Sequence, residues 1–223
     1  MNSKEKLNFR YWDIFYKKRN LTNRPTKFAL FCRKKLNNYK GTLYDIGSGN
    51  GRDVIYFNKN KINCIGVDKS FRAISTSKKY HSFLRKNFKK KNFCNFFKIK
   101  IKNKKFSVYS RFTLHAINYR NEKKLFRSLG KQKNLEYLFI ETRTIYDELY
   151  GSGKSVGKHE FIWLSKLKNS KNFTSHYRRF IDPKNLRRIL KKNFNILYFK
   201  KSRNFAKFKK ENPCVLRVIA KKK

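Results

Sequence analysis

The chain has 223 residues, with 59 Lys or Arg and 13 Asp or Glu, so its formal net charge is +46 at pH 7. This length suits one sizeable α/β domain and is hardly enough for two. No apolar run approaches membrane-spanning length, and the opening MNSKEKLNFRYWD lacks the apolar stretch of a signal peptide. We therefore expect a cytoplasmic protein without a membrane partner.

The positive charge alone favours nucleic acid or another polyanion as a partner, because a dense positive field attracts phosphate. Base composition is a competing explanation, since the abundant Lys, Asn, Phe, Ile and Tyr all have AT-rich codons. The lysines are spread over the whole chain and do not gather in one tail or stripe. That distribution favours the compositional explanation, so we expect any nucleic-acid binding to be unspecific.

The four cysteines, at positions 32, 64, 94 and 214, are scattered and form no C-x-x-C pair. Such spacing predicts buried, reduced thiols and neither a zinc site nor a disulfide framework. We therefore expect no metal centre.

Residues 1–40 are predicted to form a helical leader that packs on a main domain of residues 41–223. Its first helix, within residues 4–20, has apolar residues at helical spacing, at Leu7, Tyr11, Ile14 and Phe15. Pro25 is predicted to open a second helix, PTKFALFCRKKL.

The segment LYDIGSGNGRD, residues 43–53, is the main functional motif. An apolar run that contains Asp45 is followed by glycines at 47, 49 and 51, and then by VIYF, which indicates a helix. Strand, glycine-rich turn and helix let the backbone approach a nucleotide-like ligand, because glycine has no Cβ and tolerates positive φ. The dinucleotide fingerprint G-x-G-x-x-G would need a third glycine at the position of Arg52.

A second acid, Asp68, ends the next predicted strand, CIGVD. In a Rossmann-like βαβ unit an acid at this position accepts hydrogen bonds from both ribose hydroxyls. The alternative is an ordinary glycine turn before a helix, with Asp68 as a solvated strand end. Two acids, three glycines and a helix in register favour ligand binding over that alternative.

The pattern G-x-G-x-G with an acid two residues ahead resembles motif I of the class I S-adenosylmethionine (SAM)-dependent methyltransferases. The resemblance implies an α/β fold, with a Rossmann-like seven-stranded, mostly parallel sheet, helices on both faces and an antiparallel last strand. It also implies SAM as the cofactor, with Asp68 as the ribose acceptor. The cofactor-binding residues expected in the motif and around Asp68 are Asp45, Gly47, Ser48, Gly49, Asn50, Gly51, Asp68 and Lys69.

The leader RYWDIFYKKRN, followed by PTKFA, resembles that of small-molecule methyltransferases related to tellurite-resistance and thiopurine enzymes. In those enzymes aromatic residues of the leader close over the methionine end of SAM. The resemblance makes Tyr11, Trp12 and Tyr16 candidates for the same contact. An aromatic helix face that simply joins the core is the alternative.

Downstream, predicted helices and strands alternate. A helix over SFRAISTSKKYHSFL precedes a third strand within residues 92–101, where Asn95, Asn103 or the backbone would replace the acid that binds adenine in many members of the family. The next predicted elements are a strand within 106–117 and a helix over 121–130 with Asn121 as N-cap.

The last third of the chain is predicted to complete the sheet. EYLFIETR indicates a strand that ends at Glu141, with Arg143 in the turn behind it. Residues 150–176 are polar and are expected to form a mobile, lid-like insert over the site. A helix capped by Asp182 precedes two final strands, 194–201 and 214–221, which are predicted to pair antiparallel.

Open α/β sheets bind ligands beyond the carboxyl ends of their strands, where several polar residues are predicted to lie. The candidate bases are Glu141, His115 and His176, and a hydrogen-bonded structural role is the alternative for each histidine. Arginine forks suit carboxylates and phosphates, so the candidate substrate-binding residues are Arg111, Arg143, Arg178 and Arg179.

The predicted function is methyl transfer from SAM to a small, anionic acceptor. The alternative is an RNA or other nucleic-acid methyltransferase, or a non-catalytic RNA-binding relative, that uses the basic surface. The N/D-P-P-[YFW] motif of amino-methylating nucleic-acid enzymes is absent, and YSRF stands at its position. No separate RNA-binding module is visible, which also favours the small acceptor.

Overall fold

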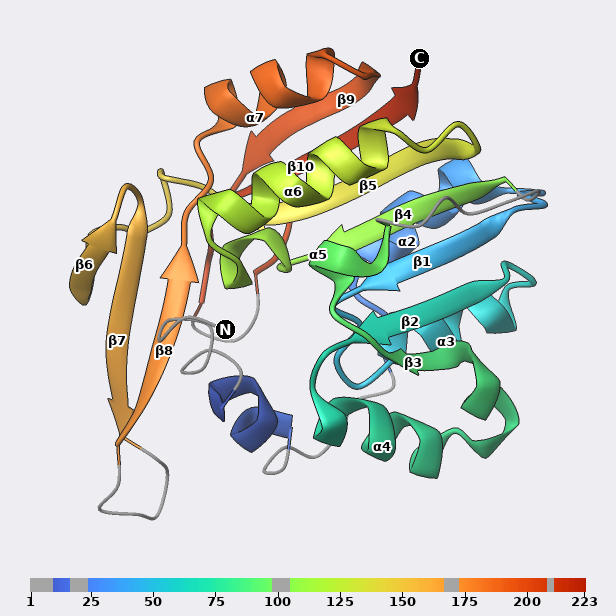
Figure 1. The fold of residues 1–223 in the computed structure, drawn as a ribbon, viewed down its shortest axis with the longest axis horizontal. Helices are drawn as coiled ribbons and strands as arrows, with labels where there is room; N and C mark the ends of the chain where they lie inside the picture. Colours follow the sequence, from blue (N-terminus) through green and yellow to red (C-terminus); the bar gives the residue numbers. More distant parts are fainter. Residues whose placement is uncertain (1–9, 17–23, 98–104, 167–172, 208–210) are drawn as a thin grey trace.

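The computed structural model describes residues 10–16, 24–97, 105–166, 173–207 and 211–223. Its centre is a seven-stranded sheet with the order β3-β2-β1-β4-β5-β10-β9 (Figure 1). The strands of this sheet are β1 (Thr42–Ile46), β2 (Cys64–Asp68), β3 (Phe88–Lys90), β4 (Phe106–Arg111), β5 (Leu135–Arg143), β9 (Phe194–Ser202) and β10 (Val215–Lys222). Neighbouring strands from β3 to β5 are parallel, and β10 runs antiparallel to both β5 and β9. The predicted Rossmann-like sheet with an antiparallel last strand is confirmed.

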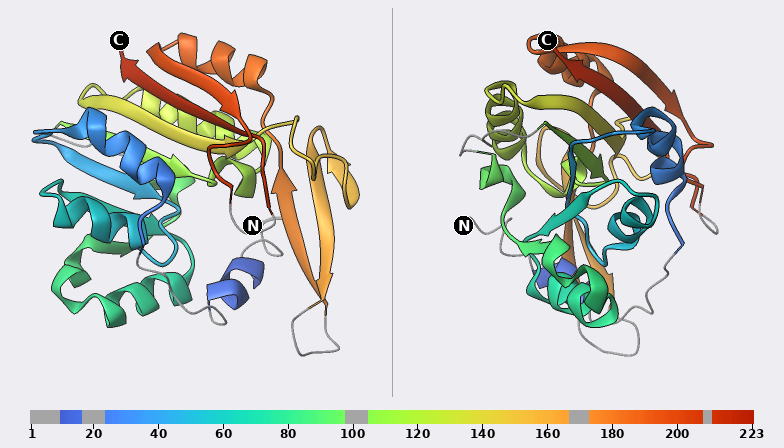
Figure 2. Two further views of the ribbon diagram at one scale, coloured as in Figure 1. Left: turned by 180° about the vertical axis from the view of Figure 1, so that it is seen from behind. Right: turned by 90° about the vertical axis from the view of Figure 1, so that its right-hand side faces the viewer.

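Helices cover both faces of this sheet (Figure 2). They are α2 (Lys27–Arg33), η1 (Lys34–Leu36), α3 (Arg52–Lys59), α4 (Phe71–Tyr80), η2 (Ser82–Asn87), α5 (Phe93–Phe96), η3 (Leu114–Ala116), α6 (Tyr119–Gly130) and α7 (Pro183–Lys191). Residues 10–16 of the leader are also helical. None of the helices in the described ranges is long and apolar enough to cross a membrane.

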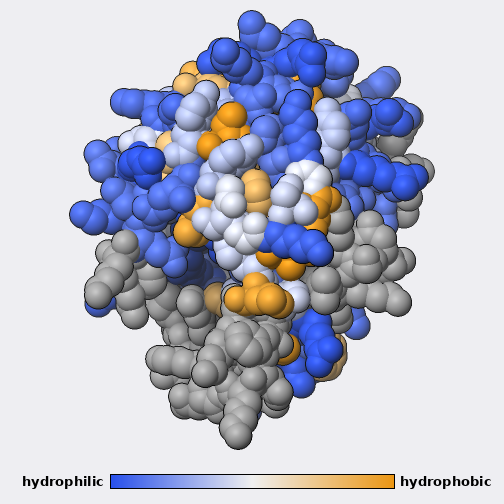
Figure 3. Space-filling model, turned by 90° about the vertical axis from the view of Figure 1, so that its left-hand side faces the viewer, coloured by the Kyte–Doolittle hydropathy of each residue, from blue (hydrophilic) through white to orange (hydrophobic). Residues whose placement is uncertain are grey.

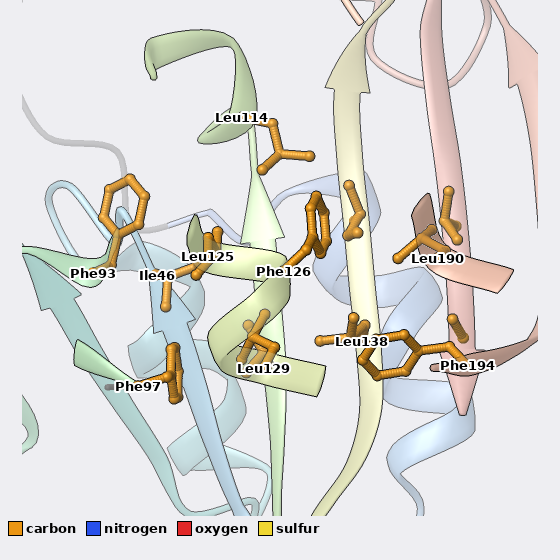
Figure 4. Packing of buried hydrophobic residues seen from close by; sticks show 14 of the residues in the cluster. Ile46, Phe93, Phe97, Leu114, Leu125, Phe126, Leu129, Leu138, Leu190 and Phe194 are labelled. Carbon is orange, nitrogen blue, oxygen red and sulfur yellow. The ribbon is translucent and has the colours of Figure 1, made fainter. Parts of the chain in front are cut away.

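Side chains of the central strands alternate between two hydrophobic cores, as expected for a sheet that is buried on both faces. In β4, Val108 joins the core under α5, α6 and α7, while its neighbour Tyr109 joins the core under α2 and α3. In β5, Leu138 and Ile140 face the first core and Phe139 faces the second. Figure 4 shows the first core, in which Leu125, Phe126 and Leu129 of α6 lie over the strands.

Local capping sets where the helices begin. The predicted Asp182 cap is confirmed, since its carboxylate accepts a hydrogen bond from the Lys184 N–H. The predicted start of α2 at Pro25 is wrong, because the Thr26 hydroxyl caps a helix that begins at Lys27. The predicted Asn121 cap is also wrong: the Asn118 side chain accepts from the Asn121 N–H at 2.9 Å, so α6 begins at Tyr119.

The prediction of the third strand within residues 92–101 is wrong for the part that the structure describes. The strand lies earlier, at β3, where Phe88 pairs with Gly66 at the carboxyl half of β2. The Asn92 side chain then accepts from the Cys94 N–H at 3.0 Å and starts the short helix α5. Asn95 lies exposed on that helix, and Asn103 lies outside the described residues.

The insert at 150–176 is not an irregular loop where the structure describes it. Its strands β6 (Lys154–Gly157), β7 (Glu160–Lys166) and β8 (Phe173–Arg179) form a second, antiparallel sheet. Phe161 and Trp163 alternate along β7, a strand pattern that the many polar residues of this segment make hard to recognise. Phe161 pairs with Arg178 of β8, and Trp163 pairs with His176. Figure 3 shows this side of the molecule, where hydrophilic side chains frame a band of paler and apolar atoms.

A buried carboxylate ties the leader to the main domain. Asp53, in the first turn of α3, accepts hydrogen bonds from the Thr26 N–H and hydroxyl, both at 2.8 Å. The Tyr109 hydroxyl of β4 donates to the same carboxylate at 2.7 Å. One acid therefore connects the cap of α2, the start of α3 and the centre of the sheet.

We expect Tyr109→Phe to lower the free energy of unfolding by about 1.5–3 kcal/mol, because it removes a hydrogen bond to a buried charged group. Urea unfolding monitored by circular dichroism measures this change. Tyr80→Phe is the matched control, because Tyr80 is 65% exposed and should change stability by less than about 0.5 kcal/mol. Equal stability of the two variants would show that the Asp53 network adds nothing.

Candidate functional site

The glycine-rich segment forms the loop between β1 and α3. Gly47, Gly49 and Gly51 all have positive φ, at 73°, 55° and 76°. The Gly47 N–H donates to the Val67 carbonyl at 2.7 Å, which ties the loop to the carboxyl end of β2. Residues with side chains rarely adopt this backbone conformation, so the three glycines are required for the loop's shape.

Asp68 closes this loop from the tip of β2. One carboxylate oxygen accepts from the Gly49 N–H at 2.9 Å, and the other accepts from the Ser70 N–H at 2.9 Å. Burial raises the pKa of Asp68 above its ordinary value, while these N–H donors and the neighbouring Lys69 oppose that rise. The predicted combination of glycine loop and second acid is therefore a single hydrogen-bonded unit.

Asp45 lies beneath the loop in β1 and is 4% exposed. Burial raises its pKa well above the ordinary value, and the nearby carboxylates of Asp53 and Asp68 add to the effect. Three acids therefore converge on the glycine loop in a chain that contains only 13. Of the other predicted loop residues, Ser48 is buried and Asn50 is half-buried.

The leader helix of residues 10–16 lies against the loop. Asp13 accepts from the Ser70 hydroxyl at 2.7 Å and forms an ion pair with Arg72 at 3.2 Å, at the start of α4. A Cβ on Gly49 would collide with the Tyr16 hydroxyl. The leader helix therefore lies over the motif, with the Tyr16 hydroxyl against Gly49. That its aromatic residues close over the methionine end of SAM stays a prediction.

Tyr11 and Trp12 lie on a different part of the site from the one predicted. The Tyr11 ring stacks on His176 with ring centroids 3.8 Å apart, and the Trp12 ring meets His176 edge-on at 5.7 Å. Trp12 and Tyr16 are four residues apart, so they share one face of the helix, and their ring centroids lie 6.1 Å apart. The Tyr16 hydroxyl is the group of this face that lies against Gly49. Both rings thus contact β8 of the second sheet, and their contact with the cofactor stays a prediction.

Glu141, a predicted base, is 1% exposed and holds two arginines in the structure. Arg111 Nε lies 3.0 Å from one of its oxygens, and Arg217 Nε lies 2.7 Å from the other. The register makes this triad, because Glu141 pairs with Arg111 of β4 and with Arg217 of β10. A buried carboxylate with both oxygens engaged by cations has the geometry of a structural ion pair.

Arg143, a predicted substrate-binding residue, ends β5 and does not lie in the turn behind it. Its guanidinium forms ion pairs with Asp147 at 3.1 Å and with Glu211 at 2.7 Å. Arg179 is likewise buried and ion-paired with Glu122. These forks are already occupied by carboxylates, so the structure does not favour the predicted pair of Arg111 and Arg143 as the anion site.

His115 and His176 come together from different elements. His115 lies in η3 and His176 in β8, and both are buried. Burial, with the positive charges of Arg178 and Arg143, lowers the pKa of His176 to about 3. The pKa of His115 is also lowered well below its usual value, by burial and by Arg178. Both imidazoles are therefore neutral at pH 7.

The sequence alone did not point to several partners in the site. Arg217 lies far along the chain from Glu141, as Glu211 does from Arg143, and their own neighbours carry no motif. Register would have suggested Arg217, because the last strand of this topology lies beside the strand of Glu141. In the described part of the chain no group of three His, Cys, Asp or Glu residues could hold a metal ion, and all four cysteines are buried thiols.

The neutral His176 predicts a loss of stability at acid pH. Its pKa rises from about 3 when folded to about 6.5 when unfolded, so the unfolded chain binds more protons between these values. Stability should be complete above pH 6.5 and fall as pH drops, by roughly 2 kcal/mol from this group at pH 5.

Urea unfolding at pH 7 and pH 5 measures this loss, and His176→Gln should reduce it by about that amount. His159→Gln is the control, because His159 is more exposed than His176 and should change the pH dependence less. An identical acid loss in wild type and His176→Gln would contradict the buried neutral imidazole.

No family model and no curated protein matches the sequence. Solved structures match most of the chain with identities far below 25%. A SAM-dependent methyltransferase from Methanosarcina mazei has 16% identity and a TM-score of 0.68, with 84% of this chain and 96% of that chain covered. A SAM-dependent methyltransferase from Clostridium acetobutylicum has 15% identity and a TM-score of 0.63, with 99% of both chains covered.

A glycopeptide N-methyltransferase crystallised with SAM has 13% identity and a TM-score of 0.62, with 88% of this chain and 94% of that chain covered. At such identities the likeness establishes the fold and leaves the narrower tellurite-resistance and thiopurine resemblance a prediction. The strand order, the glycine loop after β1 and these neighbours agree on one conclusion: this chain has the fold of the class I SAM-dependent methyltransferases.

Proposed function

We propose that the protein binds SAM and transfers its methyl group to a small-molecule acceptor. The observation that carries the proposal is the glycine loop at the ends of β1 and β2, closed by the Gly49–Asp68 hydrogen bond. Parallel α/β sheets bind nucleotide-like ligands at this edge. Neighbours of the same fold were crystallised with SAM, S-adenosylhomocysteine and sinefungin.

The residues at the loop suit such a cofactor. Gly49 offers backbone without a side chain, and the Tyr16 hydroxyl packs so closely on it that a Cβ there would collide. Each Asp68 oxygen accepts one N–H bond and keeps acceptor capacity for ribose hydroxyls. SAM, when bound, supplies a methyl group on an electrophilic sulfonium.

In-line transfer depends mainly on the orientation of the two reactants and on the exclusion of water. The leader helix contributes to both, since Asp13 fastens it to α4 while Tyr16 covers the glycine loop. Its other side, with Tyr11 and Trp12, packs on His176 of the second sheet. We place the acceptor beside these residues, near His115 of η3.

The two histidines are the remaining candidate bases of the three predicted, since Glu141 is held between two arginines. A neutral imidazole can accept a proton from a hydroxyl acceptor, but a pKa of about 3 for His176 makes it a weak base. A negative group bound beside Arg178 would offset the cationic field and raise the pKa of both imidazoles.

Methyl transfer to nucleic acid is the second candidate, and one surface favours it. Phe71, Tyr80 and Phe83 are 60%, 65% and 68% exposed on α4 and η2, the segment that begins beside Asp68. No acid occurs between Asp68 and Glu122, exposed lysines and arginines neighbour the three residues along the chain, and Lys90 lies 5.3 Å from the centroid of the Phe71 ring. Exposed aromatics among cations are typical of surfaces that stack single-stranded bases.

Calorimetry with SAM tests the first proposal. We expect Asp68→Ala to weaken binding by about 1.5–3 kcal/mol, because charged hydrogen bonds to the ribose are lost. Gly49→Ala should prevent binding, because it adds a Cβ at a φ of +55° beside Tyr16.

Gly151→Ala is the matched control, since Gly151 has a φ of +85° but its Cβ would meet nothing within 4 Å. It shares the backbone strain and lacks the collision, so SAM binding should be unchanged. If folded wild-type protein binds neither SAM nor S-adenosylhomocysteine at millimolar concentration, the methyltransferase proposal fails.

Filter binding to several RNAs and DNAs at two salt concentrations tests the second candidate. If the positive charge of the chain reflects base composition, we expect weak preference for any nucleic-acid sequence and a steep fall of affinity with salt, because phosphate contacts dominate. Alanine at Phe71, Tyr80 and Phe83 should then matter little, as should the control Leu197→Ala, another half-exposed apolar residue. A preference for one RNA that survives high salt and is lost in the triple variant would favour the nucleic-acid acceptor.

A further inference from the structure

Four arginines of the site region, all buried or partly buried, form ion pairs with carboxylates. Arg111 and Arg217 share Glu141, Arg143 has Asp147 and Glu211, and Arg179 has Glu122. Arg178 differs from them. In the described part of the chain, no carboxylate lies within ion-pair distance of its guanidinium, although burial lowers its pKa only to about 10.

Arg178 therefore keeps its positive charge at pH 7 in a half-buried position, and its Nε is buried. Taking part of a charged group out of water without a carboxylate partner is costly, because the lost hydration is not replaced. Its guanidinium lies over the Trp163 ring at 5.2 Å, which shields the charge without neutralising it. The acids whose charges act on Arg178, Glu211 and Asp147, are already bound to Arg143.

Hydrogen-bond donors around Arg178 are also unused. Buried nitrogens without a hydrogen-bond partner among the described residues include Arg178 Nε, Trp12 Nε1, His115 Nδ1 and His176 Nε2. Trp12 and Arg178 can only donate, and each neutral histidine can donate from one ring nitrogen. Buried polar groups are nearly always satisfied, so a cluster of unused donors indicates a missing acceptor.

These donors come from three elements that meet at one place. His176 and Arg178 are two residues apart in β8, so they share one face of the second sheet. The Trp12 ring contacts His176 from the leader helix, and η3 with His115 packs against β8. The Trp163 ring contacts both residues of β8, with its centroid 6.2 Å from the His176 ring and 5.2 Å from the Arg178 guanidinium. The positive charge of Arg178 also lowers the pKa of both histidines.

We propose that Arg178, with Trp12, His115 and His176, binds an oxyanion, carboxylate or phosphate, of the methyl acceptor. The inference deepens the proposed function and rests on it only for the identity of the anion as part of the acceptor. An oxyanion supplies the negative charge that Arg178 lacks and several acceptor oxygens for the unused N–H groups. Arginine forks bind such groups in a fixed orientation, which in-line transfer requires.

The test needs a local probe, because a chain of net charge +46 attracts anions everywhere. The indole N–H resonance of Trp12 in ¹⁵N-labelled protein provides it, assigned by its absence in Trp12→Phe, since the chain has two tryptophans. Inorganic phosphate and acetate are titrated separately at constant ionic strength, with chloride as the competing salt. We expect a saturable shift of the Trp12 indole resonance with at least one of the two anions. The anion that binds more tightly shows whether the site prefers a phosphate or a carboxylate.

Arg178→Gln should weaken this binding by about tenfold or more, because a charge-assisted fork is lost. Arg188→Gln is the matched control: Arg188 is exposed on α7, and its removal lowers the net charge equally. We expect wild-type binding in the control. Equal weakening in both variants, or no saturable shift in either anion, would overturn the proposal.

Calorimetry with SAM on the same samples separates the two ideas. SAM binding without an anion-dependent Trp12 shift leaves the methyltransferase proposal intact and overturns the anion site. An Arg178-dependent shift without SAM binding supports the anion site and overturns the methyltransferase proposal.

Discussion

The hydrogen bond from the Gly49 N–H to the Asp68 carboxylate is the interaction on which the site depends. It holds three glycines at positive φ against the tip of β2, where a loop with side chains would be strained. The second Asp68 oxygen binds the Ser70 N–H, and Ser70 in turn binds Asp13 of the leader. One buried carboxylate thereby sets the loop, starts α4 and positions the helix that covers both.

Scarcity of acids organises the rest of the molecule. The chain has 59 cations and 13 acids, and among the described residues the buried arginines Arg143, Arg179 and Arg217 all have carboxylate partners. Glu141 joins β4, β5 and β10 through two arginines, and Asp53 joins the leader, α3 and β4. Among the described residues Arg178 has no carboxylate partner, which is why we propose an anion-binding site around it and not a structural ion pair.

Prediction from the sequence failed in two segments, where a few residues decide the structure and the average composition of the segment is misleading. Residues 92–97 look like an apolar strand, but the Asn92 cap and the contacts of Phe93 and Phe97 with the core make α5 helical. Residues 150–176 look like a polar loop, but Phe161 and Trp163 alternate against His176 and Arg178 in an antiparallel sheet. In both segments a few residues decide the structure, and average polarity hides them.

The sequence by itself determined the main sheet apart from β3, the glycine loop and the second acid, because strand periodicity and the need for glycine at positive φ act over a few neighbouring residues. Only the tertiary structure decided the roles of the distant polar residues. Glu141 became an ion-pair centre because the antiparallel β10 brings Arg217 beside it, 76 residues away in sequence. Tyr11 and Trp12 likewise met His176 because the leader spans from the loop to the second sheet, a contact that no local pattern encodes.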